Sequence, residues 1–171
     1  MTEQQPYDVV SRFPDFEVRR YPTHVIAEVA MSGPFERAGN AGFGPLVSYI
    51  SGRNREGRKI AMTAPVIQEP LAADAHKVAF VMPAGTQVDT LPHPSAAGVH
   101  LHEVEESLAA VVTYSGRWTE SSYERRVEQL VAAVRREGLV VAGRPRYARF
   151  DPPWKPPFLR RNEVVLPVAT A

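Results

Sequence analysis

The sequence predicts an α+β protein in which two ββαββ units form an antiparallel sheet or a distorted β-barrel, with two helices packed on its outside. Two observations carry this prediction. Strand-like runs that alternate apolar and polar residues surround two stretches with the spacing of an amphipathic helix. The second half of the chain also repeats the pattern of the first at an offset of 83 residues, from Ser32 to Ser115.

The first elements are expected soon after the N-terminus. Residues 1–15 are mostly polar and contain Pro6 and Pro14, so we expect them to lie over the surface. Strands are predicted at 16–21 and 24–31, joined at Tyr21-Pro22-Thr23, and apolar residues alternate along the second run. The second strand has one apolar face, made by Val25, Ala27, Val29 and Met31.

The first helix is predicted at about 35–51. Its apolar residues recur at helical spacing: Phe43, Leu46, Val47 and Ile50. Gly52 ends the helix and a strongly charged loop follows, after which strands are expected at about 62–69 and 77–83. Pro65 cannot donate a ladder hydrogen bond, so it marks an edge strand or the entry of a strand. A crossing loop follows at 83–94.

The second half is expected to repeat this order. A helix at about 120–137 is capped by Thr119 or Ser121, with Glu124 placed for a capping box, and Gly138 ends it. The predicted strands are 99–103, 107–114, 139–141, 146–150 and 163–168.

The repeat itself sets the domain organisation. Ser32-Gly33 matches Ser115-Gly116, and a helix follows each of these breakers. The apolar strand face of the first half matches Leu108, Ala110, Val112 and Tyr114. We therefore predict a single domain over 1–171 with an internal repeat at about 16–83 and 99–168.

Composition excludes several classes of function. Twenty basic and nineteen acidic residues give a net charge of +1, which lacks the basic field that nucleic acid selects. The chain has no cysteine, which fits a reducing compartment and excludes thiolate ligation of a metal. It shows no signal peptide and no apolar run near the roughly 20 residues of a membrane span. We expect a cytoplasmic monomer.

Catalytic motifs are absent. The sequence contains no G-x-S-x-G, no phosphate-binding G-x-x-x-x-G-K-[ST] and no H-E-x-x-H. His100 and His102 share one face of a predicted strand and are a candidate metal pair, with a solvated strand face as the alternative.

Three segments together resemble the SOUL/haem-binding protein family. They are the helix and following strand at 42–54 and 62–66 (GFGPLVSYISGRN and MTAPV), the early strand FEVRRYP at 16–22, and the C-terminal hairpin from Tyr147 to Val164. They occur in the family's order over about 16–168. The resemblance implies the fold described above and non-covalent binding of haem or metal-free porphyrin, as a carrier or buffer with no catalytic activity.

The resemblance also implies a site, in a shallow apolar groove between the first helix and the C-terminal hairpin. The positions that match are Phe43 and Val47 on the helix and Trp154 and Lys155 in the hairpin. Ile50 continues the apolar stripe, although core packing explains Ile50 and Leu46 as well. Lys155 suits a propionate, as do Arg160 and Arg161, whose alternative is an ion pair with Glu163 or Asp151.

The axial ligand departs from the family pattern. Some members have a histidine as a proposed iron ligand at the position of Arg20, and a guanidinium does not ligate iron. His24 is the nearest substitute, and Tyr21 and Met62 are further candidates. The metal ligand is therefore left open, and binding need not select for the metal.

Two other functions compete with tetrapyrrole binding. The duplicated units resemble the effector-binding domains of bacterial regulators that take amphipathic cations, for which Glu28 is the candidate carboxylate. Modification of a bound tetrapyrrole would need an acid or base such as Glu28, Glu17 or His24. We expect a binding protein and not an enzyme.

Overall fold

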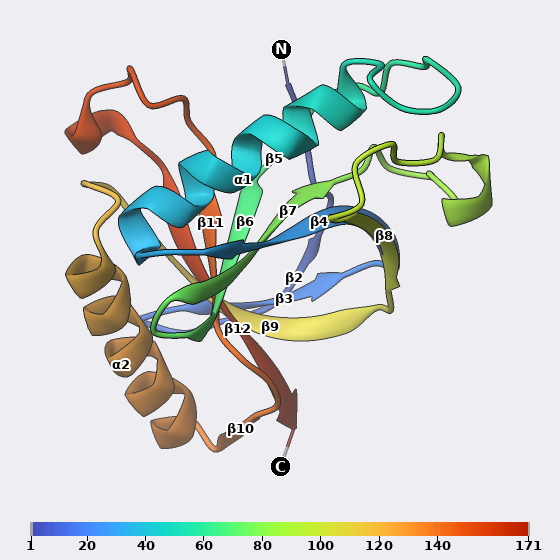
Figure 1. Ribbon diagram of the computed structural model, residues 1–171. Coiled ribbons are helices and arrows are strands. Elements are labelled where there is room, and N and C mark those ends of the chain that lie inside the picture. The colour runs from blue at the N-terminus through green and yellow to red at the C-terminus, as the bar shows by residue number, and fades with distance from the viewer. Residues whose placement is uncertain (1, 171) are drawn as a thin grey trace. The chain divides into compact units, whose positions relative to one another are not determined.

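The computed structural model describes residues 2–170, which divide into two compact units (Figure 1). The first unit contains Thr23–Glu105 and the described residues before Pro6. The second contains Pro6–Pro22 and the described chain from Glu106 onward. Each unit has one antiparallel sheet and one α-helix packed on it, so the predicted α+β class is confirmed.

The sheet of the first unit has the order β8-β4-β7-β6. A short parallel pair, β1 with β5, accompanies it. The elements of this unit are β1 (Glu3–Gln4), β4 (His24–Ser32), α1 (Phe35–Ile50), β5 (Thr63–Ala64), β6 (Val66–Ala72), β7 (Ala75–Val81), the 3₁₀ turn η1 (Val88–Thr90) and β8 (Val99–Val104).

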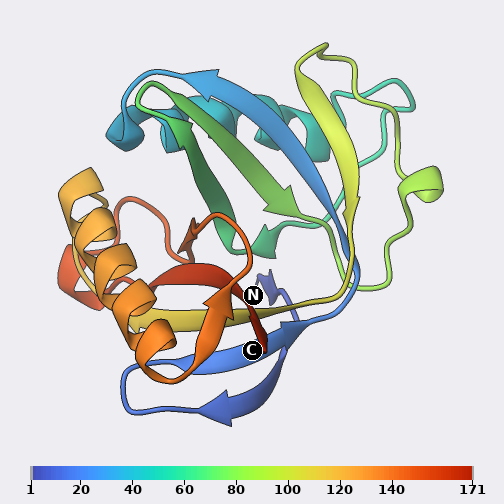
Figure 2. The ribbon, with the colours of Figure 1, turned by 90° about the horizontal axis from the view of Figure 1, so that it is seen from below.

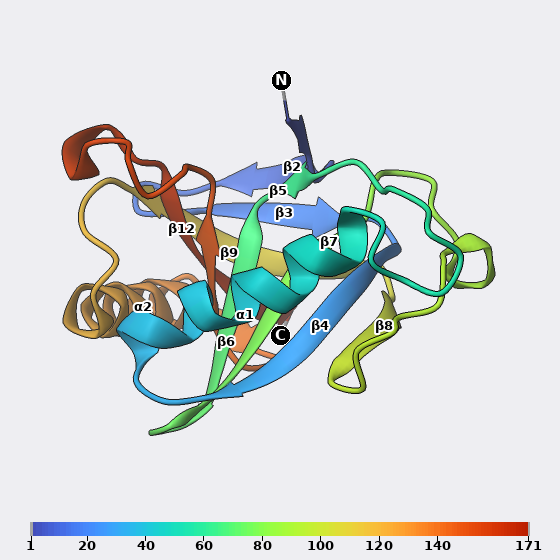
Figure 3. The ribbon, with the colours of Figure 1, turned by 45° about the horizontal axis from the view of Figure 1, so that its top comes forward.

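Helix α1 crosses one face of this sheet, over β4 and β7 (Figure 3). Leu46 and Ile50 are buried in the core, as the apolar stripe predicted, together with Val25, Ala27 and Val29 of β4. The buried helix face also includes small residues that the sequence pattern did not emphasise, namely Ala38, Gly39 and Gly42. Their small size brings the helix close to the strands, and Phe43 is left at the edge of the stripe, 41% exposed.

The sheet of the second unit has the order β2-β3-β9-β12-β11, and β10 pairs with β12. Figure 2 shows β2, β3 and β9 running side by side. The elements of this unit are β2 (Asp8–Arg12), β3 (Glu17–Tyr21), β9 (Ser107–Tyr114), α2 (Glu120–Arg136), β10 (Leu139–Val141), β11 (Arg146–Arg149), η2 (Pro157–Leu159) and β12 (Asn162–Thr170).

Helix α2 begins at the predicted cap. The Thr119 side chain accepts a hydrogen bond from the Ser122 backbone N–H, so Thr119 and not Ser121 is the cap. Tyr123, Leu130 and Val134 form the buried stripe that packs on the sheet. Arg135 and Arg136 in the last turn complement the negative end of the helix dipole.

The two units do not coincide with the two halves of the sequence. Strand β3 of the first half pairs with β9, and β8 of the second half pairs with β4. The first unit therefore contains β8 from the second half of the sequence, and the second unit contains β3 from the first half. With that exchange the strand orders correspond, β8-β4-β7-β6 in one unit and β3-β9-β12-β11 in the other. The boundaries predicted for a single domain stay a prediction.

Residues 2–15 include two short strands, β1 and β2, that were not predicted from the sequence. Residues 3–4 pair in parallel with β5, and β2 pairs with β3 through a register shift between Val9 and Ser11. The Gln5 N–H also donates to the Ala64 carbonyl at 2.8 Å. Short edge strands are held by backbone hydrogen bonds, which a polar sequence does not reveal. Among residues 2–170 no helix has the length and apolar character needed to cross a membrane.

Candidate functional site

The predicted helix residues of the site lie in the first unit and differ in exposure. Phe43 is exposed and its ring packs edge-on against Phe80 of β7, with 5.4 Å between centroids. Val47 and Met62 are partly buried against the same core, and Ile50 is buried within it. Phe43 is therefore the member of this set with the most apolar surface to offer a ligand.

The predicted hairpin residues lie in the second unit, between β11 and β12. Trp154 is 83% exposed, and Phe158 and Leu159 of η2 are exposed beside it in the chain. Lys155 Nζ lies 2.7 Å from Asp151 Oδ1, so its ammonium is already paired. The hairpin thus presents apolar side chains on a loop stiffened by four prolines between 152 and 157.

The two hairpin arginines have different partners. Arg161 Nη2 donates to Glu163 Oε2 at 2.9 Å, the ion pair that the sequence offered as the alternative to ligand binding. Arg160 instead donates to two backbone carbonyls, from Nε to Lys155 and from Nη2 to Pro153. Among residues 2–170, no carboxylate lies within 4.0 Å of the Arg160 guanidinium, so its charge has no acidic partner there.

Two of the candidate iron ligands, His24 and Tyr21, each lie beside a polar side chain. His24 Nε2 lies 3.2 Å from Gln5 Nε2, and Tyr21 Oη accepts a hydrogen bond from Arg19 at 3.1 Å. His100 and His102 are exposed on β8, as their solvated-face alternative predicts. Residues 2–170 contain no group of three or more His, Cys, Asp or Glu side chains that could hold a metal ion.

The candidate acids are also paired. Glu17 Oε2 lies 2.7 Å from Arg19 Nε, and Glu28 Oε2 lies 3.5 Å from Lys77 Nζ. Each carboxylate therefore has a cation beside it.

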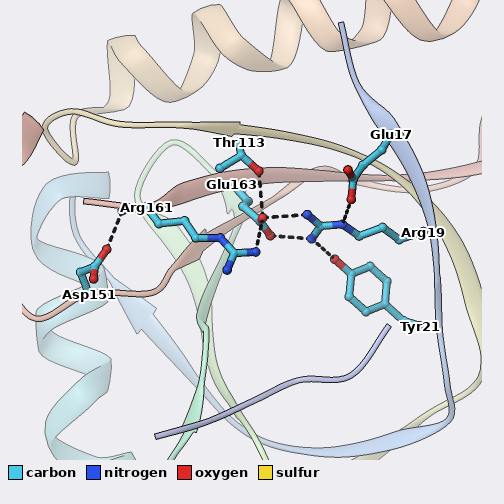
Figure 4. Close-up of polar contacts among 7 residues, drawn as sticks. All are labelled: Glu17, Arg19, Tyr21, Thr113, Asp151, Arg161 and Glu163. Atoms are coloured by element: carbon cyan, nitrogen blue, oxygen red, sulfur yellow. Dashed lines mark hydrogen bonds and ion pairs between the residues drawn. The ribbon is translucent and has the colours of Figure 1, made fainter. Parts of the chain in front are cut away.

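The densest polar cluster was not predicted as a unit. Arg19 of β3 donates two hydrogen bonds to Glu163 of β12, at 2.8 and 2.9 Å, and Figure 4 shows Thr113 and Arg161 completing the carboxylate's contacts. Burial raises the pKa of Glu163, but the hydrogen bonds and charges of Arg19 and Arg161 outweigh it and hold this pKa below its usual value. Every oxygen of Glu163 is satisfied, so the cluster stabilises the unit and does not supply a free base.

Sequence reasoning missed this cluster because its members lie 144 positions apart. One signal was present: Glu163 opens an apolar run, EVVLPV, where a strand facing a core rarely places an acid.

Two heme-binding proteins are similar to this chain over most of its length. Human heme-binding protein 2 is 27% identical over 168 residues, covering 94% of this chain and 80% of that protein. Heme-binding protein 1 of Xenopus laevis is 26% identical, covering 87% and 81%.

Solved structures share the fold at lower identity. The C-terminal domain of EcmrR has a TM-score of 0.70 at 11% identity and covers 96% of this chain and 99% of that one. A protein described as a hydrolase from Listeria innocua has a TM-score of 0.61 at 14% identity, covering 92% and 94%. These likenesses show the fold alone. The family model described as SOUL heme-binding protein matches residues 2–167, and the chain belongs to that family.

Proposed function

We propose that this protein reversibly binds haem or free porphyrin without a covalent bond and acts as a carrier or buffer. The observation that carries the proposal is the family match over residues 2–167, which includes both segments predicted to form the site. The matched relatives are named for haem binding, and we propose a binding role without catalysis. Location in the cytoplasm, the monomeric state and the lack of nucleic-acid binding stay predictions.

On the helix, we propose that Phe43 supplies the main apolar contact. A porphyrin is a flat hydrophobic ring, and an exposed aromatic side chain held edge-on by Phe80 offers it a rigid surface. Val47 and Met62 border that surface, and Ile50 supports it from the core.

On the hairpin, we propose that Trp154 contacts the ring and that Lys155 or Arg160 contacts a propionate. Trp154 is the most exposed large apolar side chain among residues 2–170. Lys155 keeps 40% of its side chain exposed while paired with Asp151, so it would have to share its charge with a propionate. The helix and hairpin sets belong to different units, and a single groove that joins them stays a prediction.

The test is a titration of the apo-protein with haemin and, separately, with metal-free protoporphyrin. Saturable one-to-one binding of both, followed by the Soret band and by tryptophan quenching, is the expected result. His24→Ala tests the axial ligand. Loss of a shifted Soret band identifies His24 as the ligand, and an unchanged spectrum excludes His24. Absence of saturable binding for either compound overturns the proposal.

A second candidate is the binding of an amphipathic cation, favoured by Glu28. Its Oε2 atom is buried and has no hydrogen-bond partner among the described residues, although Lys77 lies 3.5 Å away. Titration with a lipophilic quaternary ammonium dye separates the two functions. Binding of the dye that Glu28→Gln abolishes, with no porphyrin binding, would favour this alternative.

A further inference from the structure

Three arginines of the second unit lie over the ring of Trp118 or Tyr114. The Cζ atoms of Arg149 and Arg160 are 4.6 and 4.2 Å from the ring centroid of Trp118. Arg126 of α2 lies over Tyr114, at 4.8 Å. Tyr147 connects the two contacts, because it alternates with Arg149 along β11 and its ring stacks with Tyr114 at 6.5 Å between centroids. The cluster therefore concentrates positive charge beside aromatic surface.

Arg149 is buried without a counter-ion. It is 8% exposed, its Nε has no hydrogen-bond partner among residues 2–170, and no described carboxylate lies within 4.0 Å of it. Burial lowers the pKa of Arg149, and the charge of Arg160 lowers it further, while Tyr147 opposes the shift. Arg19 of the same unit is also buried, but Glu163 and Glu17 neutralise it. Because an unpaired buried charge is strongly unfavourable, Arg149 lacks the partner that its environment calls for.

The surrounding groups are fixed in place. Arg160 is held by the carbonyls of Lys155 and Pro153, at 2.9 and 2.7 Å, which accept hydrogen bonds but do not cancel its charge. Trp118 Nε1 donates to Asn162 Oδ1 at 2.8 Å, and Asn162 is fully buried. The indole on which the two guanidinium groups lie is therefore rigid.

We propose that Arg149 and Arg160 form, beside Trp118, a binding site for an oxyanion, the carboxylate or phosphate group of a ligand. Guanidinium groups match the two oxygens of such anions in a bidentate manner, and two of them suit a doubly charged group. Arg126 adds to the positive field. The anion supplies the counter-charge that Arg149 lacks. This site does not include Phe43 and shares only Arg160 with the proposed porphyrin contacts, and its ligand is either a free anion or the carboxylate of a larger molecule.

The experiment is a titration of the full chain with inorganic phosphate, and with succinate, against chloride at constant ionic strength. The readouts are the thermal unfolding midpoint and the fluorescence of Trp118, isolated by Trp154→Phe because the chain has two tryptophans. Binding to the native state raises the midpoint in a saturable way. We expect both readouts to respond to at least one of the anions. Arg149→Met should abolish both responses.

Two further variants keep the test decisive. Arg160→Met alters a partly exposed residue that should fold normally, and it should weaken anion binding at least tenfold. Arg135→Met, in the exposed last turn of α2, is the matched control and should leave the response unchanged. The proposal is overturned if neither anion gives a saturable response in the parent protein. It is equally overturned if Arg149→Met and Arg160→Met respond like the control, since the arginines would then serve only to pack on Trp118.

A competition experiment distinguishes the sources of the anion. Phosphate that displaces haemin but not haemin dimethyl ester identifies the site as one for propionate. Phosphate that binds without displacing haemin identifies a site for a free anion. Both outcomes support the site. Failure of porphyrin binding, with the phosphate response intact, would remove the proposed function and leave this inference standing.

Discussion

Arg19 and Glu163 form a bidentate ion pair in which both side chains are almost completely buried, at 2.8 and 2.9 Å. Their strands, β3 and β12, both pair with β9, so the two side chains meet across the strand between them (Figure 4). The Arg19 guanidinium also stacks on Tyr7 at 3.9 Å. The pair thus ties an early strand to the last strand of the chain within the second unit.

Glu163→Gln should destabilise the protein by about 3 kcal/mol, because it leaves the buried Arg19 with only the partly exposed Glu17 as an acidic partner. Arg19→Met should cost a similar amount. The double variant Arg19→Met/Glu163→Gln should be considerably more stable than the sum of the single effects predicts. Urea unfolding measures all three. The matched control is Arg136→Met, which breaks an exposed pair with Asp15 and should cost no more than about 1 kcal/mol. Additive losses in the double variant would contradict the coupling.

Acid should weaken the protein through the same carboxylate. The pKa of Glu163 is lower in the folded protein than its usual 4.5, so the unfolded state binds the proton more readily. Its contribution is complete above about pH 5 and is lost as the pH falls below 4.5 and through the folded pKa. Unfolding free energies between pH 7 and pH 3 should therefore fall less steeply in Glu163→Gln than in the parent protein. Parallel curves would show that Glu163 is not the group that titrates.

Helices, most strands and the repeat could be predicted from the sequence because they follow local periodicity. Val25, Ala27 and Val29 alternate as a buried strand face should, and they are buried. Three features depend on distant parts of the chain, and among them only Glu163, an acid at the start of an apolar strand, gave a local signal. They are the exchange of β3 and β8, the pairing of Arg19 with Glu163, and the short strands before residue 15.

The candidate site was predicted less completely than the fold. The sequence placed Phe43 on the apolar stripe but could not show that small residues face the sheet and leave Phe43 exposed. The sequence also singled out Arg160 but not Arg149 or Trp118. The sequence around a strand arginine does not show whether a carboxylate lies near it in the fold.

Gly42→Ala should destabilise the protein even though alanine favours helices. A Cβ at Gly42 would come 2.6 Å from the Val78 Cβ, so α1 or β7 must shift. Gly44→Ala is the matched control on the same helix, because a Cβ there meets nothing within 4 Å. Because Gly44 precedes Pro45, whose ring disfavours the helical conformation of a preceding residue with a Cβ, Gly44→Ala should change the stability far less than Gly42→Ala does. Thermal unfolding of both variants checks the prediction, and equal shifts would contradict the close contact.

Phe43→Ala should weaken porphyrin binding with little loss of stability. The side chain is exposed, so its truncation removes ligand contact and creates no large core cavity. Leu46→Ala, three residues on, is the contrasting variant: Leu46 is fully buried and its truncation should cost about 2–5 kcal/mol. Affinity from Soret titration and stability from urea unfolding should separate the two residues. An unchanged porphyrin affinity in Phe43→Ala would show that the helix is not part of the binding site.

Trp154→Ala tests the hairpin and, with Phe43→Ala, the predicted groove. The exposed indole contributes little to stability, and unfolding should change by no more than about 0.5 kcal/mol. Porphyrin affinity should fall several-fold. Phe158 is another exposed aromatic residue of the same hairpin, and Phe158→Ala is the control for nonspecific contact with the porphyrin. Residues that contact one bound ring couple, so the double variant Phe43→Ala/Trp154→Ala should lose less affinity than the two single losses together. Strictly additive losses would indicate that the helix and the hairpin act independently, and an unchanged affinity in Trp154→Ala would exclude the hairpin.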